Sequence, residues 1–285
     1  HAHALAALAE HGFEDGLALV FDGTGIGTDG TIWGAELLDV HPAGFRRLAT
    51  FRGTRLPGAD AAVRHPARQL VARWLDAQID ITPARRRQVG LGESDTETWI
   101  RQSVRGIHAP ITHAAGRLFD AVSAWLGIAP ETVTYEGQSA IRLEAAARRA
   151  MPGRRVPVLP YSLTENDGLL YVDWSPLFQR LADPATFADH PSLWALAFHH
   201  AVARAAADMV RYGLDHSRHR RIALSGGVFM NRLLNERLAP RLRTMGLTVL
   251  RHGVTPPNDG GIALGQTVAA GLGPDRAKTN AMGDS

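Results

Sequence analysis

The sequence predicts an α/β protein, and three observations support that prediction. Residues 221–270 alternate short apolar runs with amphipathic stretches in the order strand, helix, strand, helix. This order favours two parallel strands joined by a right-handed crossover. An earlier apolar run, Leu17–Phe21, is typical of a buried strand. Apolar residues make up 45 % of the 285 residues and charged residues 21 %, as in ordinary globular domains.

The first half of the chain is predicted from its apolar periodicity. A helix pattern runs through the first ten residues, with Leu5, Leu8 and Ala9 at helical spacing. The strand at 17–21, a Gly-rich turn at Asp22–Gly30 and a second strand at Thr31–Leu38 predict a long-looped hairpin. Residues 60–150 are mainly helical in pattern. The clearest helices there are Asp60–Leu75 and Ala114–Leu126, and a further helix is predicted at Ser139–Arg149.

The second half has the more regular pattern. Gly and Pro residues end each run, which places the element boundaries. The predicted elements are the strands Leu169–Asp173, Arg221–Leu224 and Thr248–Arg251, and the helices Leu193–Tyr212, Phe229–Met245 and Ile262–Ala270. Residues 273–285 are small and polar, so we expect a disordered tail.

Composition excludes several classes of function. The chain has no cysteine, which rules out disulfides, thiolate zinc sites and a cysteine nucleophile. Its 31 basic and 28 acidic residues are mixed along the chain, so a solvated surface is favoured over a nucleic-acid interface. No apolar run approaches the roughly 20 residues of a membrane span, and no signal-peptide pattern is visible. We therefore expect a cytoplasmic protein without a membrane or nucleic-acid partner.

Two Gly-rich segments are candidates for nucleotide binding. Ser225-Gly226-Gly227 lies between a predicted strand and helix, where backbone N–H groups can hold an anion. Asn231, one turn further on, is placed to bond a sugar or base. Asp22-Gly23-Thr24-Gly25 resembles the phosphate loops of actin-like ATPases and sugar kinases. Each segment has a plainer alternative, a tight turn in the first case and a hairpin loop in the second.

A metal site is the other candidate. Without cysteine, its ligands must be histidine and carboxylate, a set that suits Fe(II), Zn(II) or Mn(II). His3, Asp22 and Asp259 are candidates because they lie on a helix, at a strand end and in a Gly/Pro-rich loop. The pattern alone leaves open that His3 is a surface residue and that Asp259 only caps a helix.

Six segments then carry a resemblance to a known family. They are Asp22–Glu36, Leu56–Arg64, Ala115–Val122, Tyr135–Ala140, Ser225–Asn231 and Pro256–Gln266. In this order they are similar to segments of the hydrogenase-maturation carbamoyltransferases. The matching part is the C-terminal domain, which itself resembles the universal tRNA threonylcarbamoyladenosine-forming protein.

The resemblance implies an actin-like/sugar-kinase (ASKHA) fold, with two RNase-H-like lobes around a nucleotide cleft. Residues 1–110 would be the remainder of the N-terminal lobe with a helical insertion, and 111–272 the C-terminal lobe. The family holds its metal with a His-x-x-x-His pair and two Asp residues. His3 matches the second histidine, and the first would sit four residues earlier, before His1. The first strands of that lobe would also lie upstream, so we expect a fragment of a longer protein.

The resemblance also implies roles for single residues. His3, Asp22 and Asp259 would hold a divalent metal, Fe or Zn, through which Asp22 and Asp259 would act in catalysis. Gly23, Thr24 and Gly25 match the first phosphate loop, and Gly226, Gly227 and Asn231 match the second nucleotide-binding loop. Asp120 and Gly137 match positions that bind the ribose of the adenylate, carbamoyl-adenylate or AMP.

The function implied is carbamoyl transfer. Upstream acylphosphatase and adenylate-forming domains would make carbamoyl-adenylate from carbamoyl phosphate and ATP. This domain would pass the carbamoyl group to the C-terminal Cys thiol of a partner maturation protein, toward the cyanide ligand of a nickel–iron hydrogenase. Alternatives are an O-carbamoyltransferase that acts on a small-molecule hydroxyl, a non-catalytic metal- and nucleotide-binding scaffold, and an actin-like ATPase.

Overall fold

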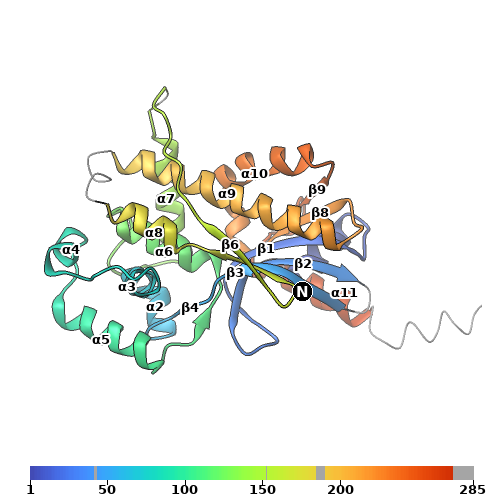
Figure 1. The fold of residues 1–285 in the computed structure, drawn as a ribbon. Coiled ribbons are helices and arrows are strands. Elements are labelled where there is room, and N and C mark those ends of the chain that lie inside the picture. Colours follow the sequence, from blue (N-terminus) through green and yellow to red (C-terminus); the bar gives the residue numbers. More distant parts are fainter. Residues whose placement is uncertain (42–43, 152, 184–189, 272–285) are drawn as a thin grey trace, which may run out of the picture.

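The computed structural model describes residues 1–41, 44–151, 153–183 and 190–271, and the tail expected at 273–285 lies outside them. A mixed β-sheet forms the centre of the fold, in the order β6-β7-β3-β2-β1-β8-β9 (Figure 1). Off this order, β5 pairs with β2, and β4 pairs with β5. The strands are β1 (Gly16–Ile26), β2 (Ile32–His41), β3 (Gly44–Phe51), β4 (Thr54–Arg55), β5 (Ile111–Thr112), β6 (Ser162–Asn166), β7 (Leu169–Asp173), β8 (Arg221–Ser225) and β9 (Thr248–Arg251). The α/β prediction is confirmed.

Strand directions agree with the sequence patterns. β1 and β2 are antiparallel, as the predicted hairpin requires, and β2 is also antiparallel to β3. β8 lies parallel to both β1 and β9, which confirms the predicted parallel pair. β7 is parallel to β3, so strands on both sides of residue 110 share one sheet. The division into two lobes at residue 110 stays a prediction.

Helices cover both faces of the sheet. They are α1 (Ala2–Glu10), α2 (Asp60–Arg64), α3 (Ala67–Asp76), α4 (Pro83–Gln88), α5 (Glu93–Arg105), α6 (Ala115–Trp125), α7 (Gln138–Arg148), α8 (Ser175–Leu181), α9 (Pro191–His216), α10 (Arg232–Thr244) and α11 (Ile262–Gly271), with 3₁₀ turns η2 (Gly227–Met230) and η3 (Asp259–Gly261). In Figure 1, α9 and α10 lie on one side of the sheet and α11 on the other.

The alternation of side chains along β1 explains this two-sided cover. Successive residues of a strand point to opposite faces. Leu17, Leu19 and Phe21 join the large core formed with α3 and α6–α10. Ala18 and Val20 point the other way, into a smaller core formed with Leu5 and Leu8 of α1. β1 is therefore buried on both faces, as its continuous apolar run predicts.

Three predicted boundaries were wrong. The helix expected at Asp60–Leu75 is split into α2 and α3, because His65 precedes Pro66 and takes an extended backbone (φ −121°, ψ 88°). The helix expected at Phe229–Met245 begins only at Arg232, after the 3₁₀ turn η2. The turn expected at Asp22–Gly30 is shorter, because β1 continues to Ile26 and pairs with β2 there. Strands β3, β4, β5 and β6 were not predicted.

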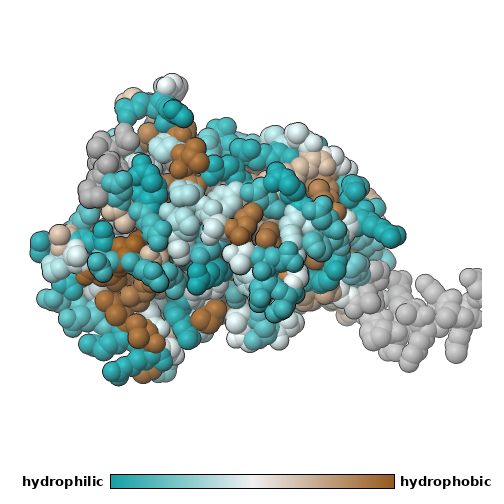
Figure 2. Space-filling view, viewed as in Figure 1, coloured by the Kyte–Doolittle hydropathy of each residue, from teal (hydrophilic) through white to brown (hydrophobic). Residues whose placement is uncertain are grey.

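The surface is mixed, with several apolar areas among polar side chains (Figure 2). Figure 2 shows apolar side chains gathered at the lower left, where α3–α5 lie in Figure 1. Val104 in α5 and Ile107 just after it are 72 % and 52 % exposed. Across the part of the chain that the structure describes, no helix is both long and apolar enough to cross a bilayer.

Candidate active site

The structure brings His3, Asp22 and Asp259 together from three elements that are distant in sequence. His3 lies on α1, Asp22 on β1 and Asp259 at the start of η3. His3 Nε2 is 3.0 Å from Asp22 Oδ2 and 3.5 Å from Asp259 Oδ1. One ligand atom from each of the three residues lies within 4.8 Å of the others. His3 and Asp22 are largely buried, whereas Asp259 is 75 % exposed, so the cluster opens to solvent on one side.

These three residues fit a divalent metal ion. An imidazole and two carboxylates are hard-to-borderline donors, suited to Fe(II), Zn(II) or Mn(II). At metal–ligand bonds of about 2.1 Å, two ligands of a tetrahedral ion are about 3.4 Å apart. The 3.5 Å from His3 to Asp259 is close to that separation, whereas the 3.0 Å from His3 to Asp22 is a hydrogen bond that an ion would replace. The donor set and the spacing therefore support the predicted metal site.

Asp22 also ties the site to both Gly-rich segments. Its Oδ2 faces His3, while its Oδ1 accepts hydrogen bonds from the N–H groups of Gly23 at 2.7 Å and Gly227 at 3.3 Å. The two segments meet because β1 and β8 are parallel neighbours whose pairing ends at Val20 and Ser225, just before both segments and at the carboxyl end of β8. Ligands of α/β proteins bind at such carboxyl ends of strands.

Gly226 makes this close approach possible. Its φ is +94°, and a Cβ there would be 2.3 Å from the carbonyl oxygen of Phe21. Its N–H donates to the carbonyl oxygen of Pro257 at 2.8 Å, which brings the loop that carries Asp259 toward β8. The tight-turn alternative for this segment therefore describes its backbone correctly. The same geometry places the turn beside the metal cluster.

Asn231 is engaged within the protein. Its Oδ1 caps α10 by accepting from the Leu234 N–H at 2.8 Å, and its Nδ2 lies 2.9 Å from Nε2 of buried His199. His199 donates from Nδ1–H to the carbonyl oxygen of Ala195, and burial lowers the pKa of His199 to about 4. A neutral His199 thus accepts from Asn231. The nucleotide role of Asn231 stays a prediction.

The other expected nucleotide residues occupy varied environments. Thr24 and Gly25 are exposed on β1 and not in a loop. Gly137 takes a left-handed backbone, φ +71°, just before α7. Asp120 is buried on α6, where its Oδ2 is 3.1 Å from Nη2 of Arg117, and burial raises the pKa of its carboxyl group. Their roles toward a nucleotide stay predictions.

Arg117 is a residue to which the sequence pattern assigned no role. A Cβ on Gly23 would lie 3.4 Å from Arg117 Nη2, so the guanidinium sits against the Gly23 segment. Its Nε and Nη1 are buried, and neither has a hydrogen-bond partner among the described residues. Arg117 lies inside Ala115–Val122, one of the six segments that resemble the family, and no other feature of the sequence pointed to Arg117.

Glu10 and His252 support the loop before Asp259 and were also missed. Glu10 accepts from the N–H groups of Gly253 and Val254 at 2.5 and 2.6 Å, and from Thr255 Oγ1 at 2.7 Å. His252 bonds Ser225 Oγ at 2.8 Å, and burial lowers its pKa. Glu10 is more than 240 residues from its partners, so no local pattern could reveal the contact.

The family described as "Carbamoyltransferase, Kae1-like Domain, second subdomain" matches residues 18–266. This chain belongs to that family. Its relative "Carbamoyltransferase HypF" of Rhodobacter capsulatus is 38 % identical over 274 residues, covering 95 % of this chain and 34 % of that protein. A "Carbamoyltransferase HypF homolog" of Cupriavidus necator is 35 % identical over 289 residues, covering 97 % of this chain and 71 % of that protein.

Solved structures of this family have the same fold. A crystal structure of full-length HypF "in the phosphate- and nucleotide-bound form" superposes with a TM-score of 0.85 at 29 % identity, over 95 % of this chain and 41 % of that one. HypF of T. kodakarensis gives a TM-score of 0.81 at 26 % identity, over 95 % and 35 %. The chain thus spans about a third of the length of the first HypF relative it matches.

Proposed function

We propose that this chain is the carbamoyl-transferring domain of a hydrogenase-maturation carbamoyltransferase. It takes carbamoyl-adenylate and passes the carbamoyl group to the C-terminal Cys thiol of a partner maturation protein. The observation that carries the proposal is the double role of Asp22. One of its oxygens faces His3 and Asp259, and the other binds both Gly-rich segments. A ligand seated on those segments would therefore have its reacting end at the metal cluster.

The protein's own groups would mainly hold and orient the adenylate. Arg117 places Nη2, which pairs with Asp120, beside Gly23, and its Nε and Nη1 have no hydrogen-bond partner among the described residues, so its guanidinium could receive the phosphate of an adenylate. The thiolate sulfur forms a bond to the carbamoyl carbon, and the bond from that carbon to the phosphate oxygen breaks, so AMP leaves with the electron pair. An ion held by His3, Asp22 and Asp259 would supply Lewis-acid polarisation of a carbonyl or phosphate oxygen. The nucleophile comes from the partner, in keeping with a chain that has no cysteine.

The test of this function supplies the acceptor directly. The complete protein that contains this chain is given ATP, carbamoyl phosphate and a peptide ending in Cys, and the peptide is followed by intact mass. We expect a gain of one carbamoyl group that Asp259→Ala abolishes. Asp80→Ala, which removes an exposed carboxylate between α3 and α4, is the matched control and should leave the gain intact. Nucleotide binding without any gain would contradict thiol transfer, and carbamoylation of a hydroxyl acceptor would favour the O-carbamoyltransferase.

The role of Arg117 has a separate test. Arg117→Gln removes the charge and should weaken AMP binding about tenfold, whereas Arg117→Lys should retain part of the affinity. Isothermal titration with AMP measures both, and circular dichroism reports whether α6 is intact. Equal AMP affinity in the wild type and Arg117→Gln would contradict a phosphate contact.

A further inference from the structure

A second cluster of side chains that can bind a metal ion lies at the end of β2. Asp39 and His41 are near the end of β2, and His219 is in the link between α9 and β8. His41 Nε2 is 3.5 Å from Asp39 Oδ2, and His219 Nε2 is 3.5 Å from Asp39 Oδ1. One ligand atom of each residue lies within 4.8 Å of the others.

This group is separate from the His3 site. Asp39 pairs with Leu17 on β1, five residues before Asp22. At about 3.3 Å per residue, the backbone positions of the two groups are about 16–17 Å apart along the strand. The two groups share no residue, so they can be changed independently.

We propose that Asp39, His41 and His219 bind a zinc-class divalent ion. Both imidazoles turn Nε2 toward one buried carboxylate, and 3.5 Å is longer than a good hydrogen bond. It equals, within about 0.1 Å, the separation of two ligands around a tetrahedral ion with bonds of about 2.1 Å. Two imidazoles and a carboxylate are a common zinc donor set, and they leave a fourth position open.

The surroundings support ion binding at Asp39. Ser217 Oγ donates a hydrogen bond to Asp39 Oδ1 at 3.0 Å. This bond holds the carboxylate in one orientation, as hydrogen bonds to metal-binding carboxylates do in known sites. The three residues line an open hollow of about 760 Å³ together with His216. His216 donates from Nδ1–H to the carbonyl oxygen of Tyr212 at 2.8 Å, so its Nε2 carries a free lone pair. His216 is not among the residues whose ligand atoms lie within 4.8 Å of one another, so the fourth position faces the hollow.

Arg46 is the group that opposes binding. Its Nη2 is 3.2 Å from Asp39 Oδ2 and also bonds the carbonyl oxygen of His216. The guanidinium neutralises the carboxylate when no ion is bound, and its charge repels a cation. The site should therefore bind zinc with moderate affinity, and removing the charge should tighten it.

Zinc stoichiometry tests the proposal on the full chain. We expect the wild type to bind two zinc ions, His41→Asn/His219→Asn one, His3→Ala one, and the triple variant none. His108→Asn is the matched control, because His108 is exposed and its positive φ of 46° suits Asn. A triple variant that binds as much zinc as His3→Ala would overturn the second site.

Two further measurements distinguish lost zinc binding from poor folding of the variants. Each single change, His41→Asn or His219→Asn, should weaken zinc at least tenfold with an unchanged far-ultraviolet spectrum. Arg46→Gln should tighten zinc several-fold, since it removes the competing charge. Unchanged or weaker zinc binding in Arg46→Gln would contradict an ion at Asp39. None of these outcomes depends on carbamoyl transfer.

Discussion

At position 226 the backbone and the neighbouring strand both require glycine. A side chain there would meet two separate penalties, the positive φ of +94° and the carbonyl oxygen of Phe21 at 2.3 Å. Gly246 provides a matched comparison, because its φ is +79° but nothing lies within 4 Å of the place a Cβ would take. A substitution at 246 therefore measures the cost of the backbone conformation alone, and the same substitution at 226 adds the cost of the steric contact.

Gly226→Ala should lower the free energy of unfolding by at least about 3 kcal/mol, and Gly246→Ala by about 1 kcal/mol. The excess at 226 arises because β1 must shift away from the turn. Urea unfolding of both variants measures the difference. Equal costs at the two positions would mean that the turn relaxes without moving Phe21.

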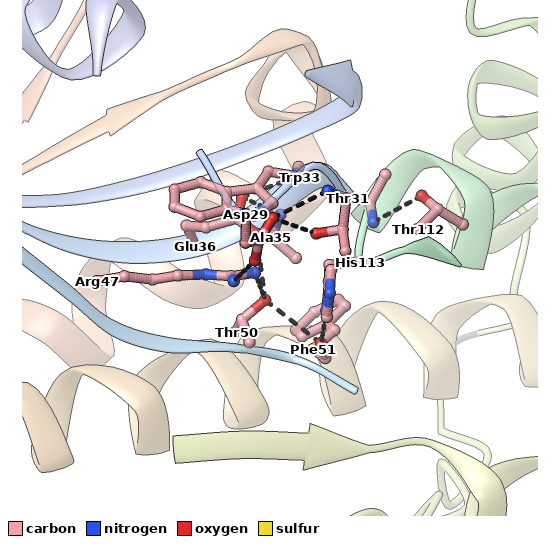
Figure 3. A network of polar contacts seen from close by, with 12 residues as sticks. Asp29, Thr31, Trp33, Ala35, Glu36, Arg47, Thr50, Phe51, Thr112 and His113 are labelled. Atoms are coloured by element: carbon pink, nitrogen blue, oxygen red, sulfur yellow. Dashed lines mark hydrogen bonds and ion pairs between the residues drawn. The ribbon is translucent and has the colours of Figure 1, made fainter. Parts of the chain in front are cut away.

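At the scale of elements, one polar network holds the β1–β2 connection against β3. Arg47 of β3 lies at its centre, with Nη1 3.0 Å from Asp29 Oδ2 and Nη2 3.0 Å from Glu36 Oε1 (Figure 3). Its guanidinium also stacks over Trp33. Asp29 accepts further bonds from Thr31 and Trp33 Nε1, so the connection has little freedom. Glu36 is buried, and burial raises the pKa of its carboxyl group.

Arg47→Met should destabilise the protein by about 3 kcal/mol at pH 7, because it leaves Glu36 buried without its counter-charge. Glu36→Gln in the same chain should restore part of the loss, since it removes the orphaned charge. The penalty should also shrink as the pH falls and Glu36 takes up a proton. Urea midpoints of the single and double variants give the comparison. A double variant no more stable than Arg47→Met would exclude a charge effect.

Glu10 joins α1 to the loop that carries Asp259, and its pKa reports that contact. Burial opposes its ionisation, but the bonds from Thr255, Val254 and Gly253 prevail and lower its pKa to about 2. The unfolded value is about 4.3, so the stabilisation is complete above that pH and is lost as the pH falls toward 2. Glu10→Gln should cost about 1–2 kcal/mol at pH 7 and almost nothing near pH 2. Exposed Glu14→Gln is the control, and a pH-independent cost for Glu10→Gln would contradict the assignment.

At the scale of the whole molecule, the sequence predicted the structural features that depend on short, periodic runs of residues. The α/β class, the hairpin and the β8–β9 pair follow from runs of a few residues and are confirmed. The break between α2 and α3 at Pro66 and the start of α10 only at Arg232 depend on single residues, and the apolar periodicity of the sequence does not reveal them. The meeting of His3, Asp22 and Asp259 depends on sheet order, because β1 borders β8 although about 200 residues separate them. Only the resemblance to a family could suggest that meeting beforehand.

Because of the same long-range closure, we expect a metal ion to stabilise the fold. α1 packs on α11 so closely that a Cβ on Gly265 would lie 1.8 Å from the carbonyl oxygen of Ala2. An ion at His3, Asp22 and Asp259 would join α1, β1 and η3, so it would bind the folded chain and not the unfolded one. At a free zinc concentration of 100 times Kd this contributes about 2.7 kcal/mol, a rise in Tm of about 5 °C.

The rise should be measured in the His41→Asn/His219→Asn background, so that only the first site contributes. A chelator should reverse it. His3→Ala should abolish the zinc-dependent rise in Tm. It should leave the Tm of the metal-free protein within a few degrees of the wild type, because the His3 side chain belongs to neither apolar core. A zinc-dependent rise that persists in His3→Ala would place the stabilising ion elsewhere, and the joining of α1 to β1 and η3 would then rest on packing alone.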